Sequence, residues 1–156
     1  PMQAGTEINL GLPALIPADY MPDVHMRLVH YKRIASADNQ EALRELQVEF
    51  IDRFGLLPDP TRNLFLITTL KLEAEQLGIV KVEAGALGGY LRFAAEPKID
   101  TLALVQMVEN EPEHYRLEGA DKLRFNWQAD TEAHRFDALH QLLKRLGPTD
   151  NTSAAA

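Results

Sequence analysis

Residues 40–59 of the chain read QEALRELQVEFIDRFGLLPD and predict one amphipathic helix, on which the fold of the first half depends. At about 100° per residue, the large apolar side chains of this stretch fall on one arc, as in a helix that packs against a core. They are Leu43, Leu46, Phe50 and Phe54. Gly55 can adopt the left-handed conformation that commonly ends a helix, and Pro58 prevents the helix from continuing. We therefore expect a firmly packed helix that ends just before Gly55.

The opposite face of the predicted helix carries the acidic residues Glu41, Glu45, Glu49 and Asp52. Glu41 has a local role available, because Asp38 could cap the helix with Glu41 three residues later. The other three acidic residues lack such a role, and two interpretations remain open for them. A charged face of an amphipathic helix is ordinarily solvated. An acidic stripe whose basic neighbours lie only at its flanks would also suit a basic partner surface.

The composition of the chain limits its possible functions. Its 156 residues are 46% hydrophobic and 25% charged, which is typical of a soluble globular protein of one domain. There is no cysteine, which excludes disulfides, thiolate catalysis and cysteine zinc sites and makes a reducing cytoplasm the expected compartment. A net charge of -7 repels phosphate backbones. Basic proteins are therefore the expected partners.

The segments before the acidic helix predict a strand and another helix. Residues 6–16 alternate apolar and polar side chains, which is typical of a half-buried edge strand until prolines interrupt it. Asp23 is placed to cap a helix with an apolar face made of Val24, Leu28, Tyr31 and Ala35. The outer face of that helix would carry Arg27, His30 and Arg33. The two helices should form an antiparallel hairpin.

The rest of the chain predicts helices and two β-hairpins. A third helix opens at Asp59 and ends at Gly78. Alternating patterns predict hairpins over residues 79–93 and 115–127, each followed by a helix, the first of which is capped by Asp100. We expect an α+β fold, with an antiparallel sheet of two hairpins, helices packed on one face, and an N-terminal helical layer.

These elements suggest how the chain is divided. We expect residues 17–147 to form a single domain. Residues 1–16 are expected to be a leader that includes an artificial boundary and the edge strand. Residues 148–156 are expected to be a disordered tail.

The histidines, glycines and carboxylates of the chain do not have the spacing or setting of metal-binding, phosphate-binding or catalytic sites. No two of the five histidines have the three- or four-residue spacing of paired metal ligands on a helix. The glycines between residues 85 and 89 lack the Lys-Ser/Thr pair of a phosphate-binding loop and suit a hairpin turn. Glu49 and Asp52 on an exposed face would lack the burial that separates two carboxyl pKa values. We expect no metal, no cofactor and no catalysis in this chain.

Three motifs resemble the C-terminal domain of the bacterial transcription-repair coupling factor family. They are Tyr20-Met21-Pro22-Asp23-Val24, then Arg27-Leu28 with Tyr31-Lys32-Arg33-Ile34-Ala35, and Ile51-Asp52-Arg53-Phe54-Gly55-Leu56-Leu57-Pro58. The resemblance covers most of residues 8–146 and is strongest over residues 17–58. In the hairpins it is limited to the order of elements and to Pro112-x-His114-Tyr115-Arg116-Leu117.

The resemblance implies a function that the residues alone do not. Full-length members of that family are ATP-dependent DNA translocases of helicase superfamily two, which remove stalled RNA polymerase and recruit nucleotide excision repair. The chain lacks the phosphate-binding loop and acidic motif of that motor, so ATP and magnesium would bind in other domains. The resemblance implies a non-catalytic, autoinhibitory module of a bacterial cytoplasmic protein. Such a module docks on the N-terminal repair-helicase-like module of the same protein and masks the site for the damage-recognition ATPase, while other domains contact RNA polymerase and DNA.

The resemblance and the acidic stripe lead to one hypothesis and two alternatives. In the hypothesis, Glu45, Glu49 and Asp52 face arginines of the N-terminal module. The first alternative is a stand-alone small-ligand-binding or enzymatic α+β domain, with a pocket between the helical layer and the sheet. In the second, basic residues of the first helix, Arg27, Lys32 and Arg33, contact DNA or polymerase rather than being solvated.

Overall fold

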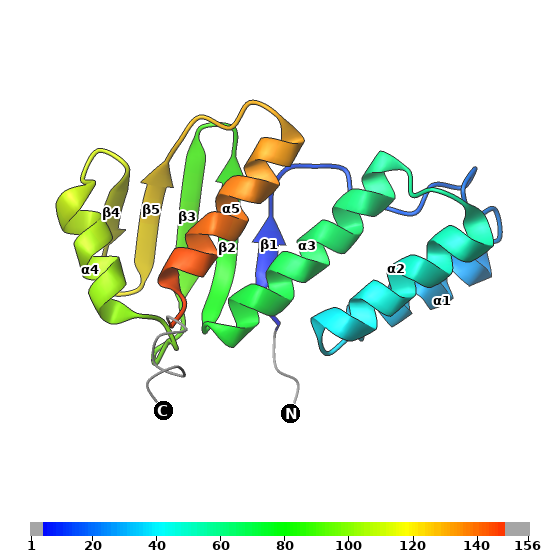
Figure 1. Ribbon diagram of the computed structural model, residues 1–156, viewed down its shortest axis with the longest axis horizontal. Helices are drawn as coiled ribbons and strands as arrows, with labels where there is room; N and C mark the ends of the chain where they lie inside the picture. Colours follow the sequence, from blue (N-terminus) through cyan, green and yellow to red (C-terminus); the bar gives the residue numbers. More distant parts are fainter. Residues whose placement is uncertain (1–4, 149–156) are drawn as a thin grey trace. The chain divides into compact units, whose positions relative to one another are not determined.

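The computed structural model describes residues 5–148, which form two compact units (Figure 1). The helical unit spans Leu12–Leu72. The sheet unit comprises the described residues 5–11 and 73–148. The single domain expected over residues 17–147 stays a prediction. Residues 1–4 of the expected leader and 149–156 of the expected tail lie outside the described residues.

The helical unit is built from α1 (Val24–Ala35), α2 (Gln40–Phe54) and the part of α3 (Asp59–Gln76) that precedes residue 73. The predicted apolar face of α2 is confirmed, because Leu43, Leu46 and Phe50 are buried in one cluster. Phe50 is fully buried, and its ring meets that of Phe65 on α3 edge to face, with centroids 5.2 Å apart. As predicted, α2 ends at Gly55, whose φ is 96°.

Both ends of α2 are held by neighbouring segments of the helical unit. At the start, Gln40 Nε2 donates to the Thr69 carbonyl at 3.1 Å. At the end, the Tyr20 hydroxyl donates to the Gly55 carbonyl at 2.8 Å. The predicted cap by Asp38 is wrong. The helix begins at Gln40, so the capping position falls at Asn39, whose Oδ1 accepts from the Ala42 N–H at 2.8 Å.

The orientation of α1 differs from the prediction. Asp23 caps this helix as predicted. The buried residues are His30 and Ile34, however, while Val24 and Leu28 of the predicted apolar face are 59% and 61% exposed. The imidazole of His30 tolerates burial because its Nδ1 donates to the Met26 carbonyl at 2.8 Å and its ring packs edge-on against Phe50. The predicted outer position of His30 is therefore wrong.

The sheet unit contains five strands in the order β1-β2-β3-β5-β4 (Figure 1). They are β1 (Glu7–Asn9), β2 (Ile79–Gly85), β3 (Gly88–Phe93), β4 (Tyr115–Glu118) and β5 (Lys122–Asn126). Both predicted hairpins are confirmed, β2 with β3 and β4 with β5, and an antiparallel pairing of β3 with β5 joins them. The predicted edge strand is shorter than residues 6–16 and pairs in parallel with β2. The sheet is therefore antiparallel except at this edge.

Two helices complete the sheet unit. Helix α5 (Glu132–Leu146) lies across one face of the sheet in Figure 1, and α4 (Thr101–Asn110) packs beside β4 and α5. Asp100 caps α4 as predicted, with its Oδ1 accepting from the Ala103 N–H at 3.1 Å. The core between sheet and helices contains Val82, Leu91, Leu123, Phe125, Leu139 and Leu143, all buried. Among the described residues, no helix is long and apolar enough to span a membrane.

Candidate functional site

Glu49 is the central residue of the acidic face of α2, and it is bound by two arginines of its own unit. Arg33 of α1 donates to both carboxylate oxygens, from Nη1 to Oε2 at 2.6 Å and from Nη2 to Oε1 at 2.8 Å. Arg53, one turn further along α2, donates to Oε2 at 3.0 Å. The Nε2 atom of buried His30 lies 3.8 Å from the same oxygen. Glu49 therefore links α1 to α2.

This network changes the electrostatics of Glu49. The two hydrogen bonds from Arg33, joined by one from Arg53, lower the pKa of the Glu49 carboxyl to about 2, against the effect of partial burial. The same carboxylate raises the pKa of Arg33. A bidentate arginine pair of this kind is among the stronger charge-assisted contacts, because both donors match the carboxylate geometry. Glu49 is therefore ionised and largely neutralised within the fold.

We predict that Glu49 contributes stability which is lost in acid. Its folded pKa lies near 2 and its ordinary value is 4.5, so the contribution is complete above about pH 4.5 and disappears as the pH falls towards 2. Because Glu49 remains partly solvated, the contribution should be on the order of 1 kcal/mol. Denaturant unfolding followed by circular dichroism at several pH values should show Glu49→Gln less stable than wild type near neutrality, with the gap closing in acid.

The comparison with Glu49→Gln is needed because other carboxyls titrate in the same range. Hydrogen bonds from Arg124 and Arg116 also lower the pKa of Glu118 to about 2. Wild-type acid sensitivity alone would therefore not identify Glu49. A stability gap between the two proteins that stays constant from neutrality to acid would show that the contact does not depend on the charge of Glu49.

Glu45 and Asp52 differ from Glu49, because both are exposed and neither forms an ion pair among residues 5–148. They lie on α2 four residues before and three residues after Glu49, so all three project from the same side of the helix. Glu45 and Glu49 line an open hollow of about 400 Å³ between α1 and α2. The fourth residue of the predicted acidic face, Glu41, pairs with Arg44 at 2.6 Å. The face therefore contains two free carboxylates, with the neutralised Glu49 between them.

The basic residues of α1 do not form the free outer face that the second alternative requires. Arg27 Nη1 donates to the carbonyls of Met21 at 2.7 Å and Pro22 at 3.0 Å. Arg33 is bound to Glu49. Of the three residues in that alternative, only Lys32 is exposed without a hydrogen bond or ion pair from its side chain to the other described residues.

Only part of this network could be found from the sequence. The Glu49–Arg53 pair follows from the four-residue spacing on one helix. Arg33 and His30 could not be assigned to Glu49, because their contacts depend on how α1 is rotated about its axis against α2. The predicted rotation placed His30 on the outer face, opposite to its observed position.

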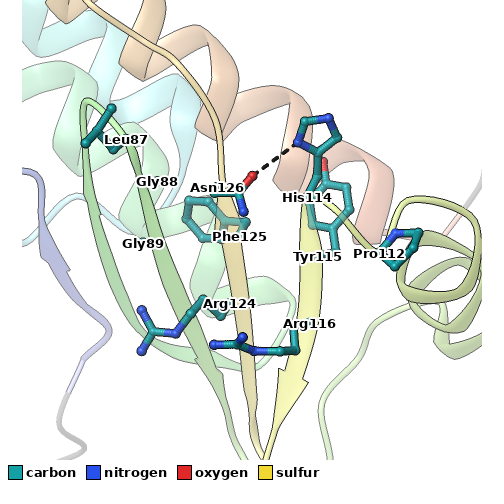
Figure 2. Close-up of a pocket in the computed structure, with 10 residues that line it drawn as sticks. All are labelled: Leu87, Gly88, Gly89, Pro112, His114, Tyr115, Arg116, Arg124, Phe125 and Asn126. Carbon is teal, nitrogen blue, oxygen red and sulfur yellow. Dashed lines mark hydrogen bonds between the residues drawn. The ribbon is translucent and has the colours of Figure 1, made fainter.

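A second hollow, of about 360 Å³, lies in the sheet unit where β3 and β4 begin and β5 ends (Figure 2). Its lining includes Gly88 and Gly89, the basic residues Arg116 and Arg124, and the polar residues His114 and Asn126. Arg116 and Arg124 extend from neighbouring strands to the same side in Figure 2. His114 and Asn126 are joined through Nδ1 and Oδ1 at 3.2 Å. The small-ligand alternative stays a prediction.

A metal site requires several ligating side chains placed together, and the expected absence of catalysis stays a prediction. Between residues 5 and 148, no three histidine, aspartate or glutamate side chains are placed to hold a metal ion. His140 instead pairs with Glu73 at 3.0 Å on the surface of the sheet unit.

Comparison with known proteins gives one consistent result. A model of the TRCF domain family matches residues 10–104. The transcription-repair-coupling factor of Escherichia coli (strain K12) is 42% identical over 141 residues, which are 90% of this chain and 12% of that protein. The Haemophilus influenzae protein of the same name is 42% identical over 144 residues, 92% of this chain and 13% of that protein. The chain therefore spans about an eighth of the length of these relatives.

A solved structure has the same fold. The crystal structure of the C-terminal domain of transcription-repair coupling factor superimposes with a TM-score of 0.74 at 23% identity, covering 92% of this chain and 94% of that one. At this identity the likeness concerns the fold, and it agrees with the predicted α+β class.

Proposed function

The chain belongs to the TRCF domain family, and on that premise we propose that it is a non-catalytic regulatory module of a transcription-repair coupling factor. The whole protein would be an ATP-dependent DNA translocase that removes stalled RNA polymerase and recruits nucleotide excision repair in the bacterial cytoplasm. In this proposal, ATP and magnesium act in other domains. The present module acts by binding another part of the same protein and holding it in an inactive arrangement.

The observation that carries this proposal is the pair of free carboxylates on a well-held helix. Glu45 and Asp52 are exposed and project from one side of α2. The helix that presents them is fixed by buried Phe50 on its other side and by hydrogen bonds from Gln40 and Tyr20 at its ends. Little conformational freedom is then lost when a partner binds, which favours association.

In the proposed complex, the acidic face of α2 binds arginines of the N-terminal repair-helicase-like module. Glu45 and Asp52 supply the unpaired charges. Glu49 would take part by sharing a carboxylate that Arg33 and Arg53 already hold, so a partner arginine must compete with these two. We therefore expect Glu49 to contribute less to binding than its neighbours and more to the position of α1 against α2.

Charge pairs suit a contact that must open. An exposed pair typically contributes about 0.2–1 kcal/mol, so two or three pairs bind weakly between separate molecules. Within one chain, a tether can raise the effective concentration of the partner to the millimolar range, which shifts even a weak contact towards the closed arrangement. Binding of the motor to polymerase and DNA would need only a modest free energy to open it and expose the site for the damage-recognition ATPase.

We predict that Glu45→Lys together with Asp52→Lys opens the full-length protein. The double substitution replaces two attractions by repulsions and keeps all members of the Glu49 network. Pull-down or calorimetry should show tighter binding of the damage-recognition ATPase to this variant than to wild type, by about 10-fold or more if each reversal costs the contact about 1 kcal/mol. Glu96→Lys together with Glu109→Lys, at two exposed positions of the sheet unit, is the matched control for the change in charge and should bind like wild type.

Two results would count against this mechanism. If the double variant binds the ATPase no more tightly than wild type, the acidic face does not hold the module shut. If the isolated module binds the N-terminal module with an affinity that does not change between about 50 and 200 mM salt, charge pairing is not the main contribution. Exposed apolar residues, such as Val24 and Leu28 of α1, would then be the next surface to test.

A further inference from the structure

The face of the sheet opposite α5 is basic, although the chain as a whole is acidic. Side chains alternate between the two faces of a strand, so those that flank the buried Leu91, Leu123 and Phe125, and their cross-strand partners on β2 and β4, point away from the helix. They include Lys81, Arg92, Arg116, Lys122 and Arg124, five of the nine lysines and arginines in the sheet unit. We call this the basic face.

Tyr90 on the central strand β3 is surrounded by four of these cations. Lys122 Nζ lies 4.5 Å from the centre of its ring. The guanidinium carbons of Arg124 and Arg92 lie at 5.7 Å and 5.9 Å, and Lys81 Nζ at 5.9 Å. Each distance is within the range of a cation–π contact. The basic face therefore places positive charges on several sides of one half-buried aromatic ring.

Four carboxylates, Glu7, Glu83, Glu118 and Asp121, pair with these cations and offset four of the five positive charges. Lys81 pairs with Glu7 at 3.5 Å and Glu83 at 3.8 Å, and Arg92 with Asp121 at 4.0 Å. The excess of positive charge is therefore greatest along β4 and β5. There, one oxygen of Glu118 accepts from both Arg116 and Arg124, at 2.6 and 2.9 Å. One carboxylate thus serves two arginines, and each guanidinium keeps further N–H donors.

The hollow of Figure 2 adjoins this charged region, and its lining includes Gly88 and Gly89, which have no side chains. Arg116 and Arg124 stand at one side, and the hydrogen-bonded pair of His114 and Asn126 at another. Its volume of about 360 Å³ is at the lower end of the usual range for small-ligand sites. A flat group could lie on the glycine backbone with its polar edge towards Asn126 and its charge towards the arginines.

We propose that the basic face binds a short single-stranded nucleic acid. Base stacking on Tyr90, phosphate contacts to Arg116, Lys122 and Arg124, and a second base in the hollow would together use every feature described above. An acidic peptide would use the cations but would leave the aromatic ring and the amide–imidazole pair without a role. The site lies in the sheet unit and does not depend on the proposed contact of α2.

The net charge of -7 does not forbid such binding, because close contacts depend on local charge. At ordinary salt, charges separated by more than about 8–10 Å are largely screened. The overall charge should instead slow association and keep the affinity modest. This agrees with a role in contacting a strand that other domains already hold.

The test is fluorescence anisotropy of a labelled oligothymidylate of about 12 nucleotides, titrated with this chain at about 50 mM salt. We expect saturable binding. The logarithm of the association constant should fall with the logarithm of the salt concentration at a slope of about -2 to -3, as for three or four phosphate contacts on a single strand. Tyr90→Ala should weaken binding by about 5- to 150-fold, while Tyr90→Phe should keep most of it. Lys122→Glu should weaken binding strongly. Lys144→Glu makes the same charge change at an exposed position of α5 and should weaken oligonucleotide binding only slightly.

Circular dichroism of each variant would separate loss of binding from loss of folding, and Lys122→Glu tests the same surface without removing an aromatic ring. Absence of oligonucleotide binding at low salt would overturn the proposal. So would binding that is unaffected by Tyr90→Ala, because no base would then stack on this ring. Equal competition by polyglutamate and unlabelled oligothymidylate would also overturn it, because it would indicate a site for acidic protein segments. None of these results would bear on the α2 contact, which is measured by recruitment of the ATPase.

Discussion

Phe50→Ala is expected to destabilise the helical unit by about 3–5 kcal/mol, the usual cost of removing a buried phenylalanine. Phe50 is fully buried, and its ring lies 5.2 Å from that of Phe65 and 5.1 Å from that of His30. Truncation would leave a cavity beneath α2 and remove the packing that encloses the His30 imidazole. Because many domains are stable by only about 5–15 kcal/mol, this loss should be plain in denaturant unfolding followed by circular dichroism.

Val48→Ala is the matched control, because Val48 lies on the same helix and is 53% exposed. It should change the free energy of unfolding by less than about 0.5 kcal/mol. Equal effects of the two substitutions would mean that the apolar face of α2 is not the main support of the helical unit. Packing of the apolar face would then not hold α2 rigidly, as the proposed contact of the acidic face requires.

Gly89→Ala is expected to damage the sheet unit severely. A methyl group at this position of β3 would overlap the Glu83 carbonyl of β2 and lie 2.7 Å from the Ala84 Cα atom. Both obstacles are backbone, so neither can move aside as a flexible side chain could. The cost should exceed the roughly 1–3 kcal/mol of ordinary overpacking, and the hairpin should separate or the chain fail to fold.

Gly85→Ala in the same hairpin is a control that should not lower the free energy of unfolding. No atom lies within 4 Å of a methyl group placed at Gly85, and the φ of Gly85 is not positive. This substitution should be neutral or should stabilise the fold by up to about 1 kcal/mol, because alanine restricts the unfolded chain. Trp127, whose Nε1 donates to the Gly85 carbonyl at 2.8 Å, is the only tryptophan and reports on this hairpin by fluorescence. Equal stabilities of the two variants would show that β2 and β3 are not packed as closely as described.

The two proposals place different tasks on the two units of the chain. The helical unit would bind a basic partner through Glu45 and Asp52, and the sheet unit a polyanion through the basic face around Tyr90. Opposite charges on separate surfaces would let each contact be tested without disturbing the other. Variants in both, combined in one protein, should show additive effects if the surfaces act independently.

The candidate site was partly predictable from residue spacing. Helical periodicity placed Glu45, Glu49 and Asp52 on one side of α2, and the structure confirms that Glu45 and Asp52 are exposed. It could not show that Glu49 is neutralised, because Arg33 comes from another helix. The basic face could not be predicted from the sequence, because its five cations lie on four strands and come together only when the strands pair.

Local patterns by themselves determined the elements of this protein. Asp23 and Asp100 cap their helices, Gly55 ends α2, and alternation with glycine turns sets both hairpins, because each depends on interactions within a few residues. Tertiary structure alone decided the parallel pairing of β1 with β2, the rotation that buries His30 in place of Leu28, and the partners of Glu49. In these three cases the free energy comes from contacts between distant segments, such as His30 with Phe50 and Arg33 with Glu49, which outweigh the weak preference of one helix for its own most apolar face.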